Sequence, residues 1–571
     1  MVVIGMSQDT LWTRAYGDEY WADVTSPLFF SLLGYYLTEY VNHEGARIMG
    51  YWEIADKDLL RLHKGHIYFN TEVLEYVFTS NPKFSRTKEL LNYFPEKDQE
   101  RIANAKMKAG RRIWAEIRIT LLDPDGMITR TDKVHKKWAE SFLTKMKRFD
   151  SLDLRKLTDE ELYTEYKDME NAFLKHYRLI RYGLVTHSIG SNLMIKRWLQ
   201  DWLDDKSGAL YSKLISGLPD NKTITTNTAL MRLAKSARDD TRVLDALRSM
   251  QSRDFVMELE SNHSMNDFSI KFQELLREYG HRSHTREMYF PRWVDEPSLV
   301  VDVLKALVSS PEIDVDALEK KKSEERIAAE KEVLDRISKL KFGFFKKLIF
   351  KTVLKYAQIY LAFRENQRFY LDHTIYRQRR IFTEYGRRFV ERGVIDRQDD
   401  IHFLSKEEIF ATSRNEHTVS KETIKQRREE FEKYADRLPP KFLRGNTEFD
   451  DTVVHEGLVP RITGTGASPG TVTGVVRVVT SINGLSEVRE GEILVTSNTD
   501  PGWTPVFPKL GGLITETGGI LSHGAIVSRE YNIPAVTAVN DATKILKTGQ
   551  RITVDGNEGV VTVLEEPKLG H

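Results

Sequence analysis

The hydrophobic and polar positions follow two different periods in two parts of this chain. From residue 26 to 436, apolar residues recur at intervals of three and four with charges between them, as in DEELYTEYKDMENAFLKHYRLIRYGLV and KETIKQRREEFEKYADRL. This spacing is typical of amphipathic helices. From about residue 462, short apolar runs with glycine turns, such as TVTGVVRVV, GEILVTS, GGLITE, PAVTAV and RITVDGNEGVVTVL, predict strands. We therefore expect a multidomain protein in which a large, mainly α-helical domain precedes a small β/β/α domain.

Within the helical part, residues 316–362 predict a long helical hairpin. Its first arm is highly charged, and its second, which begins KFGFFKKLIFKTVLKY, is apolar and basic. A basic amphipathic helix could lie on a membrane surface, and the plainer interpretation is a hairpin packed on the other helices. The segment RLPPKFLRGNTEFDDTVVHEGLVPRITGTGASPG then predicts a linker. The expected limits are 1–436 for the helical domain, 437–461 for the linker and 462–571 for the β-rich domain.

Composition and charge exclude several classes of function. The 85 Lys and Arg residues nearly balance the 84 Asp and Glu residues, so the global charge does not indicate nucleic acid or an anionic membrane. Cysteine is absent, which excludes disulfides, a thiolate nucleophile and a Cys-ligated metal. The start, MVVIGMSQDT, has no basic region, and the most apolar stretch, SPLFFSLLGYYLTEYV, is too short to span a membrane. We expect a cytoplasmic protein without nucleic-acid or membrane partners.

One histidine stands in an unusual local sequence, TETGGILSHGAIVSREYNIPAV, at residues 515–536. Gly518 and Gly519 permit backbone angles that turn amide groups inward, and Ser522 is a good N-cap that places His523 at the first helical position. The start of a helix attracts anions, phosphate above all. A neutral imidazole beside such an anion site can act as a nucleophile and form a phosphohistidine. A histidine that packs a strand–helix corner is the alternative, and the residues alone leave both open.

The same stretch resembles the signature of the mobile phosphohistidine domain of phosphoenolpyruvate-utilising enzymes. GTGASPGTVTGVVRVV, TSNTDPGWTPVF and ITVDGNEGVV are similar to further parts of that domain, so the resemblance covers residues 462 to about 564. It implies that His523 carries a phosphoryl group and that the domain swings between two stations. The residues expected to shape the phosphate site are Thr515, Thr517, Gly518, Gly519 and Ser522.

The helical part is similar to the acceptor domain of rifampin phosphotransferases. The matching segments are LWTRAYGDEYWADVTSPLF, LREYGHRSHTREMYFPRWVDEP and FRENQRFYLDHTIYRQRRIFTEYGRRFVERGVI. The first departs from the family pattern, because Asp18 intervenes before Glu19 and Ser26 separates Thr25 from Pro27. For acceptor binding, the residues that we expect are Arg14, Arg282 and Trp503.

Two arginines and two possible bases are the catalytic candidates of the helical part. Arg364 and Arg368 lie four residues apart, on one face of a predicted helix, and guanidinium groups suit the charge of a transferring phosphoryl group. A solvated basic face is the alternative. For the acceptor hydroxyl, a general base is needed within hydrogen-bond reach, and His281 and Glu19 are the candidates, with a packed polar pair as the alternative.

A metal site is not expected in this sequence. His281 and His284 form an H-x-x-H pair with Glu287 nearby, but a helical frame and a fourth ligand are missing.

The nucleotide-binding domain of the family, an ATP-grasp fold, is not found before Trp12, and the phosphoenolpyruvate-binding barrel is not found after the mobile domain. This division is similar to phenylphosphate synthase and related alcohol or phenol phosphorylating systems. We therefore expect a phosphotransferase subunit that is inactive without a separate ATP-grasp subunit holding ATP and Mg²⁺. It would pass a phosphoryl group through His523 to a small aromatic or apolar alcohol or phenol, with AMP and phosphate as products. The alternative is a non-catalytic phosphohistidine carrier or regulator that another kinase phosphorylates.

Overall fold

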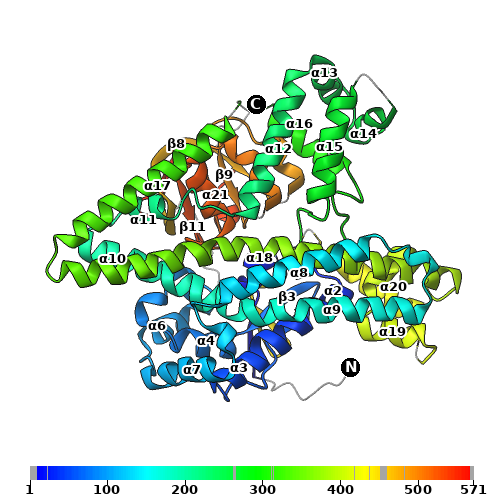
Figure 1. Cartoon of the computed structure of the whole chain (residues 1–571), viewed down its shortest axis with the longest axis horizontal. Helices are drawn as coiled ribbons and strands as arrows, with labels where there is room; N and C mark the ends of the chain where they lie inside the picture. Colours follow the sequence, from blue (N-terminus) through cyan, green and yellow to red (C-terminus); the bar gives the residue numbers. More distant parts are fainter. Residues whose placement is uncertain are drawn as a thin grey trace. The chain divides into compact units, whose positions relative to one another are not determined.

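The computed structural model of this chain divides into two compact units, each built from segments distant in sequence (Figure 1). Unit 1 comprises Met1–His187, Thr285–Phe290 and Tyr370–Asp451. Unit 2 comprises Ser188–His284, Pro291–Phe369 and Thr452–His571. The structure describes residues 9–21, 23–261, 265–309, 312, 314–416, 418–435, 437–450, 460–480, 482–499 and 501–565.

Unit 1 joins helices to a small antiparallel sheet with strand order β2-β3-β1-β4-β5. The central strand β1 pairs with both β3 and β4. It therefore joins the hairpin β2–β3, near the start of the chain, to the hairpin β4–β5, more than 300 residues later. The strands are β1 (Leu11–Thr13), β2 (Leu60–His63), β3 (His66–Asn70), β4 (Phe442–Arg444) and β5 (Thr447–Phe449). The helices are α1 (Ala15–Tyr20), α2 (Pro27–Phe29), α3 (Glu44–Met49), α4 (Thr71–Thr79), α5 (Lys88–Leu91), α6 (Glu96–Asn104), α7 (Ala109–Leu122), α8 (Thr131–Asp150), α9 (Asp159–Tyr182), α19 (Lys406–Ser413) and α20 (Lys421–Tyr434).

The sequence pattern did not predict this sheet. Its strands are three to five residues long, too short for an alternating period to show. The signal that was available is the turn between β2 and β3, where Lys64 and Gly65 both have positive φ, as tight hairpin turns require. The expected linker at 437–461 contains the hairpin β4–β5, and its residues 451–459 lie outside the described part of the chain. The expected domain limits stay a prediction.

Unit 2 contains a compact group of helices, α12 to α16, and a long helical hairpin (Figure 1). The hairpin arms are α17 (Val315–Ser338) and α18 (Gly343–Glu391), and residues of both arms share one apolar core. The Gln358 amide on α18 donates to Glu330 Oε1 on α17 at 2.8 Å. α18 supplies residues to both units. The other helices are α10 (Gly190–Leu203), α11 (Ala209–Leu214), α12 (Lys222–Asp239), α13 (Thr241–Ser249), α14 (Ser252–Ser261), α15 (Asn266–Tyr279), α16 (Ser298–Val308), α21 (His523–Tyr531) and α22 (Ala542–Ile545).

An eight-stranded sheet, in the order β6-β13-β12-β8-β9-β10-β11-β7, forms the C-terminal part of unit 2. Strands β8 to β11 are parallel, and antiparallel strands flank them. The strands are β6 (Arg461–Thr463), β7 (Thr465–Ser468), β8 (Thr471–Val478), β9 (Ile493–Thr496), β10 (Gly512–Thr515), β11 (Ala535–Thr537), β12 (Arg551–Asp555) and β13 (Val560–Glu565). The predicted order, a mainly helical part followed by a small β-rich part, is confirmed.

The turn between β12 and β13 shows how the sequence fixes this sheet. The Asp555 carboxylate accepts hydrogen bonds from the backbone N–H of Asn557 at 2.9 Å and of Glu558 at 3.1 Å, and Gly559 has a φ of +69°. An Asp that closes its own turn and a Gly with left-handed backbone are typical of a tight hairpin. The predicted DGNEG turn is confirmed.

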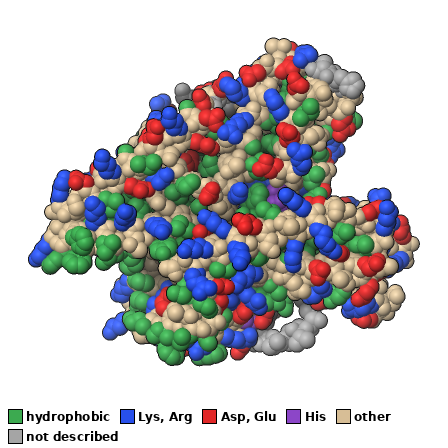
Figure 2. All heavy atoms as spheres, viewed as in Figure 1, with side chains coloured by type: hydrophobic (Ala, Val, Ile, Leu, Met, Phe, Trp, Pro, Cys, Tyr) green, Lys and Arg blue, Asp and Glu red, His purple; other side chains and the backbone are tan. Residues whose placement is uncertain are grey.

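Basic and acidic side chains are interspersed over the face shown in Figure 2. This mixture matches the near balance of charges in the sequence. Every helix within the described residues is too short or too polar to cross a bilayer.

Candidate functional site

The site begins where the chain turns from β10 into α21. Ser522 is the N-cap of α21, its Oγ accepts from the Ala525 N–H at 3.4 Å, and His523 is the first helical residue. Gly518 has a φ of +92°, and a Cβ there would lie 2.7 Å from the Cβ of Ser522. At Gly524, a Cβ would lie 2.6 Å from Thr499 Oγ1. The predicted cap and helix start are confirmed, and both glycines are required for the turn to close around them.

The two ring nitrogens of His523 face different partners. Nε2 lies 3.2 Å from Thr504 Oγ1, within hydrogen-bond distance. Nδ1 lies 3.9 Å from Glu365 Oε2, which is too long for a hydrogen bond but within ion-pair distance when the imidazole is protonated. The ring also meets the edge of Phe507, with centroids 6.4 Å apart. His523 therefore lies between a hydroxyl and a carboxylate, with only a tenth of its side chain exposed.

Glu365, on α18, is the functional candidate that the sequence interpretation missed. Burial would raise the pKa of its carboxyl, but the pKa lies below its usual value because the His523 ring and the Arg364 guanidinium favour the charged form. The sequence feature that could have indicated Glu365 is that it is the sole acidic residue between Asp335 and Asp372. A carboxylate kept charged beside an imidazole can hold a proton on the facing nitrogen.

Polar and apolar contacts within unit 2 hold α21 against the helical segments. Buried Lys322 on α17 donates to the Arg529 carbonyl and to Asn532 Oδ1, each at 2.7 Å, at the C-terminal end of α21. Glu530 accepts from the Gly217 N–H at 3.0 Å. These contacts position His523 against Glu365. The α21 region also joins the apolar core of α10, α11, α17 and α18 through Ile520, Leu521 and Ile526.

The threonines predicted to shape the phosphate site donate their hydroxyl hydrogen bonds to backbone carbonyls. Thr515 Oγ1 donates to the Thr517 carbonyl at 2.9 Å, and Thr517 Oγ1 donates to the Ser497 carbonyl at 3.1 Å. The Gly519 carbonyl accepts from the Ser522 N–H at 2.9 Å. Both threonine hydroxyls fix the shape of the turn, and the hydroxyl that faces His523 belongs to Thr504, which was not predicted.

The predicted catalytic residues of the helical part lie along and beside α18. Arg364 adjoins Glu365, and Arg368 lies one turn further on, with 5% of its surface exposed. His281 is buried, and its ring meets the edge of Phe369, also on α18, with centroids 4.7 Å apart. The structure therefore brings His281 to the helix that carries Glu365.

The predicted acceptor-binding residues are buried or bonded to other parts of the protein. Arg14 donates to the Pro439 carbonyl at 3.1 Å and pairs with Asp18, and Arg282 is buried. Trp503 is 5% exposed and belongs to the apolar core of the β-rich part. The role of these residues in acceptor binding stays a prediction. Glu19 lies in α1, but its side chain is outside the part of the chain that the structure describes.

A metal centre has no suitable ligand group in this chain as far as it is described. Both oxygens of Glu287 are taken by Ser26, with Oε2 accepting from its N–H at 3.0 Å and Oε1 from its hydroxyl at 2.7 Å. Residues 9 to 565, outside the gaps given above, hold no cluster of three or more His, Asp or Glu side chains that could bind an ion.

Comparison with known families finds matches in two segments of the chain. Residues 488–559 match the PEP-utilising enzyme mobile domain, and residues 182–365 match the rifampicin phosphotransferase fourth domain. His523 lies in the first match, and Glu365 is the last residue of the second. The expected resemblance is confirmed in two segments of the chain: one is similar to the mobile domain of PEP-utilising enzymes, and the other to the fourth domain of rifampicin phosphotransferases.

Individual relatives agree with these matches. The chain is 29% identical over 384 residues to rifampicin phosphotransferase of Bacillus subtilis, covering 66% of this chain and 44% of that protein. It is 28% identical over 407 residues to rifampicin phosphotransferase of Streptomyces sviceus, covering 69% and 46%. It is 25% identical over 428 residues to the prodigiosin synthesizing transferase PigC of Serratia marcescens, covering 73% and 47%. The chain thus spans less than half the length of each of these relatives.

Proposed function

We propose that this chain carries a phosphoryl group on His523 from ATP to the hydroxyl of a small aromatic or apolar alcohol or phenol. The observation that supports this most is the 3.9 Å contact between His523 in the mobile-domain match and buried Glu365 in the fourth-domain match. A phosphoryl carrier must meet a polar, largely desolvated surface at the place where it discharges. Relatives named for rifampicin and for prodigiosin synthesis support a small-molecule acceptor.

In the first step, the lone pair of His523 Nε2 attacks the β-phosphorus of ATP, and the bond from this phosphorus to the oxygen of AMP breaks. Water then cleaves the outer phosphate, which leaves as inorganic phosphate, so that one phosphoryl group stays on Nε2. The proton stays on Nδ1, because this nitrogen faces the Glu365 carboxylate. Thr504 Oγ1 lies beside Nε2, where its hydroxyl can donate to a phosphoryl oxygen. This assignment makes Nε2 the reacting nitrogen.

In the second step, the acceptor oxygen attacks phosphorus and the P–N bond breaks, returning its electron pair to Nε2. A proton on Nδ1 makes the imidazole a better leaving group, and the charged Glu365 keeps it there. Arg364 and Arg368 supply positive charge for the transferring group, and His281 is the candidate base for the acceptor proton.

We further propose that a separate ATP-grasp subunit holds ATP with Mg²⁺ and charges His523, giving AMP and phosphate as products. This subunit supplies the nucleotide chemistry, and the chain alone is inactive toward ATP. The family resemblance is the support for this part of the proposal.

The test uses the full chain with an ATP-grasp protein from the same source and with β- or γ-labelled ATP. Acid-labile label from β-labelled ATP should stay on the wild type, label from γ-labelled ATP should be released as phosphate, and neither label should remain on the His523→Ala variant. His63→Ala is the matched control, because His63 also faces a carboxylate, that of Glu448 at 2.6 Å. Label on the His523→Ala variant would overturn the proposal. Label that no alcohol or phenol discharges would favour the non-catalytic carrier.

A further inference from the structure

Arg529, on α21, is a buried cation. It is 4% exposed, its Nε donates to the Ala467 carbonyl at 2.9 Å, and another N–H donates to the Ile520 carbonyl. Among the described residues, no Asp or Glu forms an ion pair with it. Burial lowers the pKa of this guanidinium. A buried charge that is paired only with carbonyls is poorly compensated.

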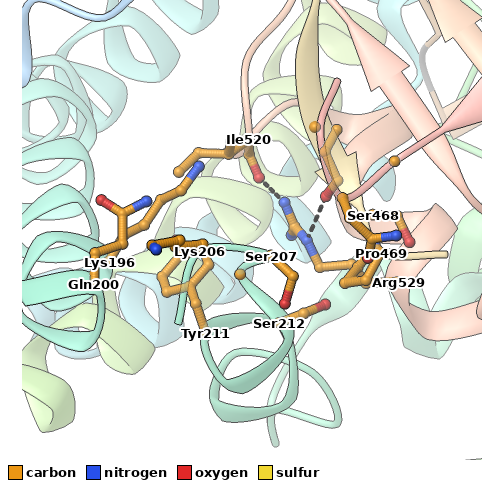
Figure 3. Close-up of a pocket in the computed structure, with 15 residues that line it drawn as sticks. Lys196, Gln200, Lys206, Ser207, Tyr211, Ser212, Ser468, Pro469, Ile520 and Arg529 are labelled. Atoms are coloured by element: carbon orange, nitrogen blue, oxygen red, sulfur yellow. Dashed lines mark hydrogen bonds between the residues drawn. The ribbon is translucent and has the colours of Figure 1, made fainter. Parts of the chain in front are cut away.

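A cavity of about 80 Å³ adjoins Arg529 within unit 2 (Figure 3). Lys196 and Lys206, from α10 and the turn that follows it, line the cavity opposite Ser468 and Arg529 of the β-rich part. Among the residues that the structure describes, no Asp or Glu lines it. The cavity has room for several waters or for one tetrahedral oxyanion.

Ser468 gives this cavity a second feature of a binding site. The residue ends β7 and is 1% exposed, and its Oγ has no hydrogen-bond partner among the described residues. Buried hydroxyls are normally hydrogen-bonded. A ligand oxygen in the cavity would satisfy this hydroxyl and the Arg529 charge together.

We infer that this cavity binds a tetrahedral oxyanion, either inorganic phosphate or a phosphate monoester. Lys196, Arg529 and the Ser468 hydroxyl are donors that such an anion requires, and Lys206, which is exposed and pairs with Asp204 at 3.3 Å, adds positive charge beside the cavity. Because the donors come from α10 and its following turn and from the β-rich part, the bound anion links the two. It thereby stabilises the position of α21 in which His523 meets Glu365.

Equilibrium dialysis with labelled inorganic phosphate tests this site, with glycerol phosphate and sulfate as competitors. The variant Lys196→Gln/Lys206→Gln should bind phosphate about 10-fold more weakly or worse, and Ser468→Ala should weaken binding roughly 3-fold. The matched control Lys213→Gln/Lys235→Gln removes the same charge from exposed positions of unit 2 and should bind like the wild type. Competition by glycerol phosphate would show that the site accepts monoesters, and competition by sulfate alone would show an anion site limited to free ions.

Two results would overturn the inference. One is the absence of saturable phosphate binding by the wild type. The other is a loss of binding in His523→Ala together with full binding in the double-lysine variant, since the anion would then sit at His523. The dialysis needs neither ATP nor a partner, so failure of the proposed phosphotransferase function would not alter its outcome.

A different surface, at the turn between α17 and α18, carries a second inference independently. Five large apolar side chains there are more than half exposed, and they belong to Phe342, Phe344, Phe345, Leu348 and Ile349. They contribute to the green patch at the left of Figure 2. Scattered exposed apolar residues are ordinary, but a contiguous patch indicates an interaction surface.

Lysines predominate in the sequence around this patch, and one of them, Lys339, pairs with Asp335. Between Asp335 and Glu365 the sequence has no acidic residue. Six lysines flank or interleave the patch, namely Lys339, Lys341, Lys346, Lys347, Lys351 and Lys355. Aromatic and aliphatic side chains on one side of a helix, with lysines beside them, are typical of segments that lie in the interface of an anionic membrane.

We propose that the end of this hairpin, residues 339–355, binds the surface of an anionic phospholipid membrane without spanning it. For this segment the proposal replaces the expectation that no membrane is a partner. The apolar side chains enter the boundary of the acyl chains, and the lysines stay at the headgroups.

Co-sedimentation with phosphatidylcholine vesicles, with and without phosphatidylglycerol, tests the proposal. The wild type should bind only vesicles that contain phosphatidylglycerol, and Phe344→Ser/Phe345→Ser/Leu348→Ser should lose at least about 10-fold in partitioning. Leu121→Ser/Leu122→Ser, which changes exposed apolar residues of α7, is the matched control. Failure of the wild type to bind would overturn the proposal, and so would full binding by the triple-serine variant. Self-association without vesicle binding would assign the patch to a protein contact instead.

Discussion

Two regions of the molecule contain buried histidines, and their surroundings differ in kind. In unit 1, His135 Nε2 lies 3.2 Å from His176 Nδ1, and both rings pack against Trp138. Burial lowers the pKa of His135 to about 3, and it also lowers the pKa of His176 far below the usual value. In unit 2, His523 starts a helix and faces a hydroxyl and a carboxylate.

The comparison shows that burial alone does not make a histidine reactive. The pair in unit 1 is neutral because aromatic packing removes water from both rings. At His523, the carboxylate of Glu365 can support a proton on one nitrogen while the other reacts. The difference between the two regions therefore lies in the groups that can stabilise charge in a transition state, rather than in how deeply the histidine ring is buried.

The largest expected effect comes from removing His523. Phosphoramidate, a small phosphoryl donor that needs no nucleotide, should place one phosphoryl group on the wild type and none on His523→Ala. His135→Phe should be phosphorylated like the wild type, because its ring lies in an aromatic core. Intact-mass measurement and phosphorus NMR at alkaline pH provide the readout. Phosphorylation mapped to His135 or His176 would contradict the claim that only the surroundings of His523 make a histidine reactive.

The next effect comes from Glu365. In Glu365→Gln, the amide cannot stabilise a proton on His523 Nδ1, so transfer from the phosphohistidine to an alcohol or phenol should slow by about 10²-fold. Formation of the phosphohistidine from phosphoramidate should change far less. Single-turnover discharge of the labelled protein measures the rate, and Glu332→Gln, an exposed carboxylate change on α17, is the control. Equal discharge rates in both variants would show that Glu365 is structural.

The sequence predicted features that depend on neighbouring residues and missed those that depend on contacts between distant segments. Ser522 and His523 were placed correctly, because an N-cap and a glycine turn are local features. Glu365 and Thr504 were missed, because they meet His523 only after α18 and the segment Pro501–Lys509 pack together. No spacing in the sequence encodes that packing.

The same dependence on local pattern explains which parts of the fold were predicted. The helix α9, the two arms of the hairpin and the strands of the β-rich part carry repeated periods and were predicted. The second arm was expected to end near residue 362, but α18 runs to Glu391. The sheet of unit 1 pairs β1 with β4, more than 400 residues later, and strands of three residues hold too little pattern to reveal such a pairing.

A third prediction concerns the stability of the aromatic histidine pair. The folded state keeps His135 unprotonated down to about pH 3, whereas the unfolded chain takes up a proton near pH 6.5. Between these values the unfolded state binds one more proton, so the free energy of unfolding falls as the pH falls, by at most about 1.4 kcal/mol per pH unit. Urea unfolding at a series of pH values should show a shallower slope for His135→Phe below pH 6.5 and the same dependence as the wild type above pH 7. An unchanged slope at low pH would contradict the buried, neutral state.

The smallest expected effect compares the helix caps of the two regions. Ser522 caps α21 with a single hydrogen bond, and Thr158 caps α9 with a reciprocal pair to Glu161. Replacing either cap by alanine should lower the free energy of unfolding by about 1 kcal/mol, measured by urea unfolding. The two variants should differ in phosphohistidine formation, because Ser522→Ala also loosens the start of the helix that positions His523, whereas Thr158→Ala leaves that helix unchanged. If both variants accept phosphate from phosphoramidate at the wild-type rate, the cap serves stability alone, and the reactivity of His523 depends on Glu365 and Thr504 rather than on the helix start.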